Sequence, residues 1–473
     1  MKSQFKFLLI SILSVFVFIS VFISSRAFFQ SQLMAHFIWN LNTFRGLFVH
    51  LPDNLPKEHI IGSYAFAFKD YYNHLPRTVS QNAIFYSAAL GFLCAVYLPL
   101  FFLKQEEREN ARLVRMKNIV SYVVIAILGL GARLFFAYHT TCNHDIVSWY
   151  IDKDILEQGK NVFAVTDRYN YSPFWLLILK FLIKIGRLVP QLPFMFLVRS
   201  FLTLVDLITL VVVIQLARVI GFSSKKAAAL FFLNPIAIII TGYHGQFDNI
   251  PVLCLLLAIY FFLRHGQKMV SWGWFLVTLG IIVKHEILQQ VLIFLRQAKR
   301  SKVQIIFLFS LSVALFLLSF VPYWKEGSAK ILANVFRYGG ISRPYGFILL
   351  DLNPTVAIVH KYLFIVLLLA WPFCIKTNRL LKSSLLGMLL FLVFTSGISA
   401  QQFVLPIALA SLQPSSGFYL FTAAASVFLF GNIDELKLPF FEPIGWNYVW
   451  IATSIWFVFE LKQKAVVQPK TDL

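Results

Sequence analysis

The chain has 473 residues, of which 59% are hydrophobic and 13% are charged, and its mean hydropathy is +0.73. Soluble domains carry about 25% charged residues, and apolar runs long enough to cross a bilayer recur along this chain. The composition excludes an ordinary soluble domain and predicts an all-α, polytopic integral membrane protein. The net charge of +21 comes from Lys and Arg gathered in short loops such as 104–117, 296–302 and 376–382. Such loops orient spans with their basic side inward and contact anionic membrane lipids, so no nucleic-acid partner is implied.

The chain begins with two expected spans that flank a long loop. Residues 5–24 form an apolar run after a short basic start, and we expect an uncleaved span here rather than a removed signal peptide. Residues 25–81 are then an outer loop, and 82–103 return to the inside before the basic loop 104–117. The next run, 119–138, leads outward again, so the residues after it lie on the outer side.

The run 173–189 is expected to lie at the outer membrane surface instead of crossing the bilayer. Lys180, Lys184 and Arg187 recur on one helical face within it. Such a face is typical of an interfacial amphipathic helix. The charge bias of the loops then fits these further spans: 194–217, 225–242, 249–264, 271–283, 286–296, 303–322, 356–375, 380–398, 402–413, 416–431 and 447–461. The total is about 13–14 transmembrane helices plus this juxtamembrane helix, with both ends of the chain inside.

Polar side chains gather in five segments that this topology places on the outer side. They are the loop 139–172, GYHGQFDN (242–249), VKHE (283–286), RYGGISRPYG (337–346) and SGISAQQ (396–402). One membrane-embedded unit with a shared outer site explains this best. We expect a two-span addition in 1–118, a core with the outer loops in 119–345, and helices that complete the bundle in 346–473.

Several of these residues have a structural alternative. Asp145 is either a general base near an acceptor hydroxyl or an ordinary helix N-cap. Asp248 follows two glycines and is either a site acid or the N-cap of the next helix. Lys284 is a site residue at membrane depth or a lysine that extends to the interface.

The arginines are open in the same way. Arg337 and Arg343 have the planar fork that matches phosphate oxygens, and they could equally contact lipid headgroups. Arg199 and Asp206 lie seven residues apart on one span. This spacing is too long for an ion pair between them, so each is expected to have another partner, with Asp206 in a structural role.

With these residues in view, the chain resembles the GT-C superfamily of polyprenyl-phosphate-sugar-dependent glycosyltransferases, above all the branch with the GPI mannosyltransferase I type and its bacterial and archaeal relatives. The resemblance rests on RLFFAYHTTCNHDIVSWYIDKDIL, GKNVFAVTDRYNYSPFWLLIL, FFLNPIAIIITGYHGQFDNIPVLCLLLA, VKHE, NVFRYGGISRPYG and SGISAQQFVLPIAL. It covers about residues 119 to 413. It implies an Asp145 base, and it implies a lipid phosphate bound by Arg343 or Lys284.

The resemblance and the polar segments together give a set of expected substrate contacts. They are His144, Tyr171, His244, Gln246, Asp248, Lys284, His285, Arg337, Arg343 and Gln401. No cofactor is expected. A divalent metal is not favoured, because Asp145 follows Asn143 and His144 where many relatives show paired acids, and because a metal needs three or four protein ligands.

The resemblance implies an inverting displacement. Asp145 takes the proton of an acceptor hydroxyl, which attacks the anomeric carbon of a polyprenyl-phosphate sugar, with mannose or another hexose transferred to a glycan, lipid or protein. The expected location is a bacterial inner membrane with the site facing outward. A transporter or flippase of lipid-linked sugars is the main alternative, and a sugar-polymer ligase is a second. Transporters place their ionisable residues near the bilayer midplane between repeats, and neither feature is visible here.

Overall fold

The computed structural model describes residues 111–140, 144–337, 345–347, 354–375, 379–431 and 441–463, together with isolated positions between 17 and 91. Within these ranges every regular element is a helix, which confirms the all-α polytopic prediction. The predicted spans 5–24 and 82–103 lie outside the described residues apart from the isolated positions.

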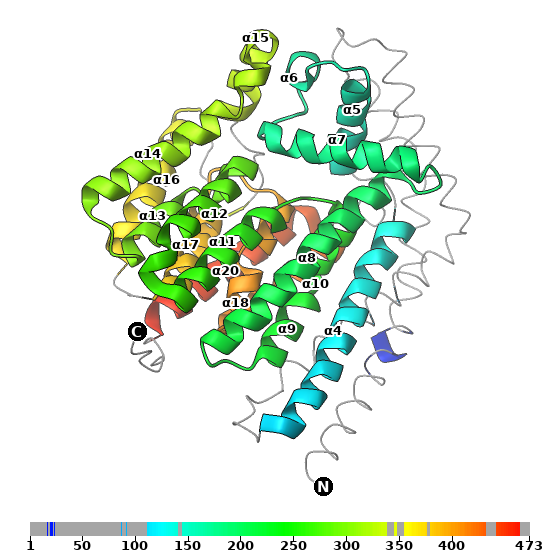
Figure 1. The fold of residues 1–473 in the computed structure, drawn as a ribbon, viewed down its shortest axis with the longest axis vertical. Helices are drawn as coiled ribbons and strands as arrows, with labels where there is room; N and C mark the ends of the chain where they lie inside the picture. The colour runs from blue at the N-terminus through cyan, green and yellow to red at the C-terminus, as the bar shows by residue number, and fades with distance from the viewer. Residues whose placement is uncertain are drawn as a thin grey trace.

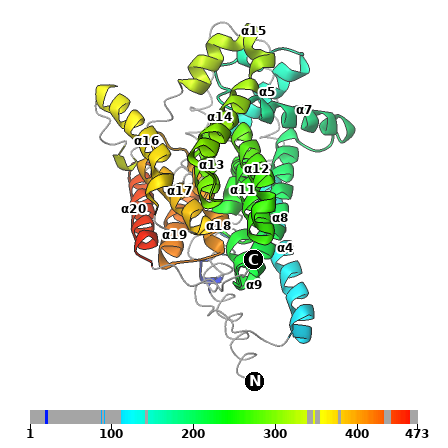
Figure 2. The same cartoon turned by 60° about the vertical axis from the view of Figure 1, so that its left-hand side comes forward.

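The N-terminal half of the described chain holds the helices nearest the expected site. They are α4 (Ala111–His139), α5 (His144–Glu157), α6 (Val162–Val165), α7 (Pro173–Leu188), α8 (Phe194–Val219), α9 (Ser224–Phe232), α10 (Pro235–Ile239), the π-helix η1 (Ile240–His244) and α11 (Asn249–His265). In Figures 1 and 2, α5, α6 and α7 gather at one end of the molecule, and α9 lies toward the other end.

The C-terminal half continues the bundle. Its elements are η2 (Gly266–Met269), α12 (Val270–Val283), η3 (His285–Ile287), α13 (Gln289–Gln297), α14 (Lys302–Leu318), α15 (Val321–Lys330), η4 (Ile331–Phe336), α16 (Pro354–Cys374), α17 (Leu380–Phe394), η6 (Ala400–Val404), α18 (Ile407–Ser411), α19 (Ser416–Gly431) and α20 (Phe441–Lys462). Figure 2 shows α16, α17, α19 and α20 as a group on one side of the molecule and α8, α11 and α12 on the other.

Four helices in the described part are long and apolar enough to cross a bilayer, or up to six if each bent pair is one span. The pair Ser224–Phe232 and Pro235–His244 bends by 45°, and the pair Lys302–Leu318 and Val321–Phe336 bends by 77°. Proline explains both breaks, since Pro235 and Pro322 lie in the first turn of the following helix and cannot continue the preceding hydrogen-bond ladder. The count of 13–14 spans stays a prediction.

The segment Asn249–Val283 folds back on itself as a hairpin of α11 and α12. Gly266, at φ +61°, makes the turn. A Cβ on Gly280 of α12 would lie 3.3 Å from the Cβ of Cys254 and 3.3 Å from the carbonyl oxygen of Pro251 on α11. The end of α12 is therefore next to the start of α11. This antiparallel pairing brings residue 284 back to residue 248.

A buried polar junction fixes α4 and α8 to each other. Arg133 Nε donates to Asp206 Oδ2 at 2.9 Å, and Arg133 Nη1 donates to the carbonyl of Phe232 at 2.7 Å. Thr241 and the Asn249 side-chain amide donate to the same carboxylate at 2.7 and 3.0 Å. The sequence prediction that Asp206 has a structural partner other than Arg199 is confirmed. A buried pair with all these hydrogen bonds fixes the order of the helices.

Arg199 contacts the ends of two helices near the site. It donates to the carbonyl oxygens of Ala137 and Thr140 at the end of α4, each at 3.3 Å, and to that of Tyr243 in η1. The last carbonyls of a helix carry partial negative charge and lack partners within the helix, so a buried guanidinium stabilises them. The end of α4 and the π-helix are thereby fixed side by side.

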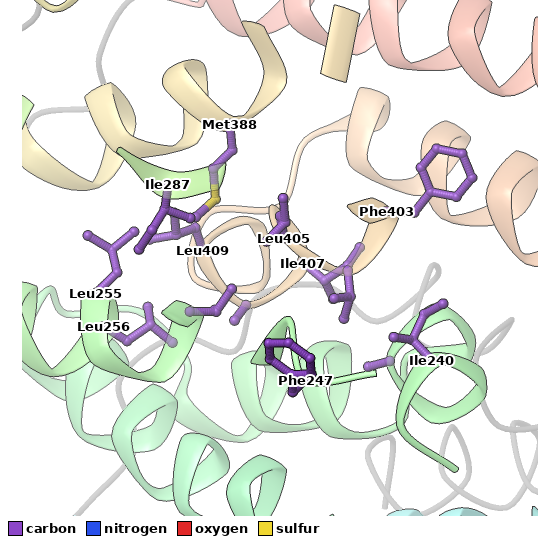
Figure 3. Close-up of a cluster of buried hydrophobic side chains, with 14 of the residues drawn as sticks. Ile240, Phe247, Leu255, Leu256, Ile287, Met388, Phe403, Leu405, Ile407 and Leu409 are labelled. Atoms are coloured by element: carbon purple, nitrogen blue, oxygen red, sulfur yellow. The ribbon is translucent and has the colours of Figure 1, made fainter. Parts of the chain in front are cut away.

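An apolar cluster brings together segments that also carry the polar residues of the site (Figure 3). Phe247, Ile287 and Phe403 are each at most 1% exposed, and they come from three separate segments. Each is adjacent in sequence to a polar residue discussed below. Close packing of these apolar side chains fixes the backbone on which the polar ones stand.

Candidate functional site

The site is built where the antiparallel helices return to the same end of the bundle. Asp145 lies in the first turn of α5, Tyr171 precedes α7, and His244 ends η1. Asp248 precedes α11, and Lys284 follows α12. These residues are separated by up to 139 positions in the chain, from 145 to 284. Their common location follows from the alternating direction of the helices.

Lys284 forms the centre of a buried ion cluster. Its ammonium is 2.8 Å from Asp248 Oδ1 and 3.4 Å from Glu286 Oε1, and its side chain is only 3% exposed. Its Nζ also lies 5.3 Å from the Tyr171 ring centre and 5.4 Å from that of Phe247, within range of a cation–π contact. Two carboxylates and two aromatic faces therefore already surround this charge.

Asp248 occupies the N-cap position of α11 without acting as a cap. Its side chain makes no capping hydrogen bond to that helix and binds Lys284 instead. Burial raises the pKa of the Asp248 carboxyl, and the neighbouring ammonium of Lys284 opposes this rise. The sequence left open that Asp248 is an ordinary N-cap. Asp248 has the position of an N-cap, but its side chain makes its hydrogen bond with Lys284 and none with the helix.

Tyr171 lies among all the charged groups of the site. Burial raises the pKa of its hydroxyl above its usual value. Lys284 opposes this shift, and the carboxylates of Asp145, Asp248 and Glu286 add to it. Trp149, which follows Asp145 on α5, lies 5.7 Å from Tyr171 between ring centres. The structure thus brings Asp145 into the same site as the ion cluster.

Asp145 contacts the π-helix. Its Oδ2 is 3.9 Å from Nδ1 of His244, and its side chain is 25% exposed. The π-helix closes with a bond from the Gly245 N–H to the Ile240 carbonyl at 3.0 Å. Single π-turns inside a helical segment occur often at functional sites, because the extra residue redirects a side chain. Here the turn presents His244 to the first turn of α5.

An aromatic cluster supports this arrangement. Trp175 and Phe247 stack with ring centres 4.3 Å apart, and Trp149 of α5 lies 5.4 Å from Trp175 and 5.7 Å from Tyr171. The indole N–H of Trp149 donates to the carbonyl oxygen of Gly245 at 3.1 Å. Offset and edge contacts between rings are the favoured geometries. The cluster fixes α5 and the residues before α7 against the turn that precedes α11.

Gly245 is a position where only glycine fits. Its φ is +65°, and a Cβ would lie 2.6 Å from Cδ1 of the buried Ile146. We expect Gly245→Ala to lower the free energy of unfolding by about 1–2 kcal/mol through the backbone alone, and further through the collision with α5. Thermal unfolding of the purified protein measures the change.

Gly159 provides a matched control for this substitution. Its φ is +70°, but a Cβ there meets nothing within 4 Å. Gly159→Ala therefore reports the backbone cost alone, and the difference between the two variants reports the collision with Ile146. Equal losses would show that α5 does not depend on close approach at Gly245.

The other expected residues are placed as follows. His144 begins α5, Gln246 is fully buried between η1 and α11, and His285 is exposed, with its ring 5.6 Å from that of Phe316. Arg337 follows η4 and is exposed; within the described residues it forms no ion pair with the acids of the cluster. Arg343 lies outside the described residues.

Two site residues were missing from the sequence-based set. Glu286 pairs with Lys284, and Gln402 Nε2 donates to Glu286 Oε1 at 2.8 Å. Gln401, which the sequence favoured, is the neighbouring buried residue on η6. The run VKHE (283–286) already contained Glu286 and could have identified it as a site residue. The pair Gln401 and Gln402 gave no sequence signal for which of the two glutamines contacts the site.

The described residues contain no group of three or more His, Cys, Asp or Glu side chains that could hold a metal ion. The described cluster supplies carboxylates, a phenol, an imidazole and a buried ammonium. A partly exposed carboxylate next to a histidine can accept a proton. The fixed acids and amides can accept or donate hydrogen bonds to a polar ligand.

Comparison with known proteins gave one finding. Neither the curated proteins nor the solved structures include a significant match to this chain. A family model described as alpha-(1->6)-mannopyranosyltransferase, N-terminal domain, matches residues 151–298, which is less than half of the 473-residue chain. The matched segment contains Tyr171, His244, Asp248, Lys284 and Glu286 and begins after Asp145; over this segment the chain is similar to a mannosyltransferase family.

Proposed function

We propose that the protein is a membrane glycosyltransferase that moves a hexose, most simply mannose, from a polyprenyl phosphate to an acceptor hydroxyl. The observation that carries this proposal is that Lys284 binds Asp248 and Glu286 beside the ring of Tyr171, while Asp145 faces His244 at the same end of the helical bundle. The match of residues 151–298 to a mannosyltransferase family supports the reaction class. The closer likeness to the GPI mannosyltransferase I type belongs to the same proposal.

Asp145 is the general base of the proposed reaction. Its carboxylate accepts the proton of the acceptor hydroxyl, whose oxygen then forms a bond to the anomeric carbon. The bond between that carbon and the phosphate oxygen breaks, and polyprenyl phosphate leaves with the electron pair. A single displacement inverts the anomeric centre. The acceptor is a hydroxyl of a glycan, lipid or protein.

The charge of the departing phosphate needs a cation that is not already neutralised. Lys284 shares its charge between Asp248 and Glu286 and is 3% exposed. The exposed Arg337, and Arg343 further along the sequence, are better suited, since guanidinium binds phosphate through paired hydrogen bonds. We therefore assign the lipid phosphate to these arginines, and we assign Lys284 to the organisation of the acids.

The direction of the basic loops supports an outward-facing site. From the site, α11 leads to Arg264, α12 returns, and α13 leads away again to Arg296. Lys225 and Lys226 lie at the start of α9, whose pair with α10 and η1 runs toward the site. Basic residues in short loops favour the inner side of a membrane, so the site at the opposite ends of these helices faces outward, as in a bacterial inner membrane.

The proposal is tested with the purified chain in liposomes. The donors are radiolabelled polyprenyl-phosphate mannose, glucose and arabinose, and the products are free polyprenyl phosphate and labelled acceptor. We expect the mannose donor to be cleaved, and we expect this cleavage to require an added extract that contains glycan, lipid and protein acceptors. Movement of intact labelled lipid across the bilayer without cleavage would instead identify the transporter that the sequence left as an alternative.

A further inference from the structure

Glu286 has no role in the displacement described above, and its surroundings are specific. It lies on η3 with a side chain that is 14% exposed. Its Oε1 accepts a hydrogen bond from Gln402 at 2.8 Å and lies 3.4 Å from the ammonium of Lys284. The neighbouring Ile287 is buried in the apolar cluster of Figure 3. Two partners from different segments therefore fix one oxygen of this carboxylate.

The orientation of Gln402 is itself determined. The backbone N–H of Ser399 donates to Gln402 Oε1 at 3.1 Å, as part of a capping box at the start of η6. Because the amide oxygen is taken by this bond, the amide nitrogen faces Glu286. Phe403, next in the chain, is fully buried. The donor that positions Glu286 is thus rigid.

The second carboxylate oxygen of Glu286, Oε2, lacks the donors that hold the first one. Glu286 Oε2 and Asp248 Oδ2 are shielded from solvent and receive no hydrogen bond from an N–H or hydroxyl group, and the two carboxyls lie close enough that Glu286 contributes to the raised pKa of Asp248. Both side-chain amide atoms of Gln246 are also buried without a partner. Folded proteins satisfy nearly all such atoms, and leaving them unsatisfied is unfavourable. Two carboxylate oxygens beside one ammonium that lack an N–H or hydroxyl donor point to a ligand that brings hydroxyl groups.

The carboxylates of Asp145 and Glu286 both raise the pKa of the Tyr171 hydroxyl, but their own partners differ. Asp145 lies 3.9 Å from a histidine, whereas Glu286 is bound to an ammonium and an amide N–H. The ammonium and the amide N–H hold one oxygen of Glu286 in a fixed place, which suits recognition of a ligand. Two carboxylates in one site with different environments commonly have different roles.

We propose that Glu286 is a specificity-determining residue that accepts hydrogen bonds from hydroxyl groups of the transferred hexose through its second oxygen. Asp248 Oδ2 completes this hydroxyl-binding subsite. Lys284 and Gln402 are positioning residues that act through Glu286. This inference rests on the proposed glycosyl transfer and names the part of the substrate that these residues recognise.

The test compares the unaltered protein with Glu286→Gln on a series of donors. The donors are polyprenyl-phosphate mannose and its 2-, 3-, 4- and 6-deoxy analogues, and kcat/KM is measured for each. We expect the unaltered protein to discriminate against at least one deoxy donor by about 10- to 100-fold, the effect of a hydrogen bond to a charged group. We expect Glu286→Gln to lose most of that discrimination and to transfer that deoxy donor as well as the unaltered protein does.

Gln402→Met serves as a second variant if Glu286→Gln does not fold. It keeps the carboxylate and removes the donor that orients it, so it is expected to reduce the discrimination partly. An equal fall in kcat/KM for every donor would overturn the inference, because it would show a general structural effect. Discrimination that changes only with deoxy acceptors would overturn it as well. Absence of transfer by the unaltered protein with every donor would contradict the proposed function itself.

Discussion

We expect Asp145→Asn to transfer sugar about 10²- to 10⁴-fold more slowly than the unaltered protein, which is the usual contribution of a general base. The amide has the shape of the carboxylate but cannot accept the hydroxyl proton. Asp145 lies in the first turn of α5 and is 25% exposed, and the loss of its charge removes a favourable interaction with the helix dipole of about 0.3–1 kcal/mol. The measurement is the initial rate of release of polyprenyl phosphate from labelled donor.

Asp154→Asn is the matched control on the same helix. Asp154 is 29% exposed and lies 3.9 Å from Lys153, so the same chemical change occurs at a similar exposure. Its rate is expected to stay within about twofold, as for most surface substitutions. If Asp145→Asn and Asp154→Asn had equal rates, the base would have to be another residue, and His244 would be the next candidate.

The second large effect is expected at Lys284. Lys284→Met leaves Asp248 fully buried without its ammonium, and loss of one partner of a buried pair destabilises a protein by about 3–5 kcal/mol. We expect a lower yield of folded protein and a lower thermal midpoint in detergent, measured by size-exclusion chromatography after heating. The exposed Lys180 of α7 gives the control, Lys180→Met, with no comparable loss.

A double variant separates the charge from the packing. In Lys284→Met with Asp248→Asn the buried carboxylate is neutral, so part of the lost stability is expected to return. The site stays defective because Glu286 has then lost its ammonium partner. Full loss of stability in both variants would mean that the lysine contributes through its packing on Tyr171 and Phe247 and not through its charge.

The sequence by itself determined the membrane class, the helical fold and the ends of many helices. Apolar runs identify the helices because backbone polar groups must be satisfied within them in lipid. The basic residues of the juxtamembrane run also gave the range of α7, predicted as 173–189 and observed as Pro173–Leu188. The topology predicted which polar segments share one side, because antiparallel helices alternate in direction.

The tertiary structure decided which of those polar residues meet. The hairpin of α11 and α12 pairs Lys284 with Asp248 and Glu286. No local pattern determines that choice, because it depends on where one helix ends relative to another. The resemblance implied that Arg343 or Lys284 binds the lipid phosphate, and that role stays a prediction. Gln402, and not Gln401, binds Glu286 because successive residues on a tight 3₁₀ turn point about 120° apart. The class and topology follow from local composition, and the pairing of charges follows from packing across 36 to 116 positions of chain.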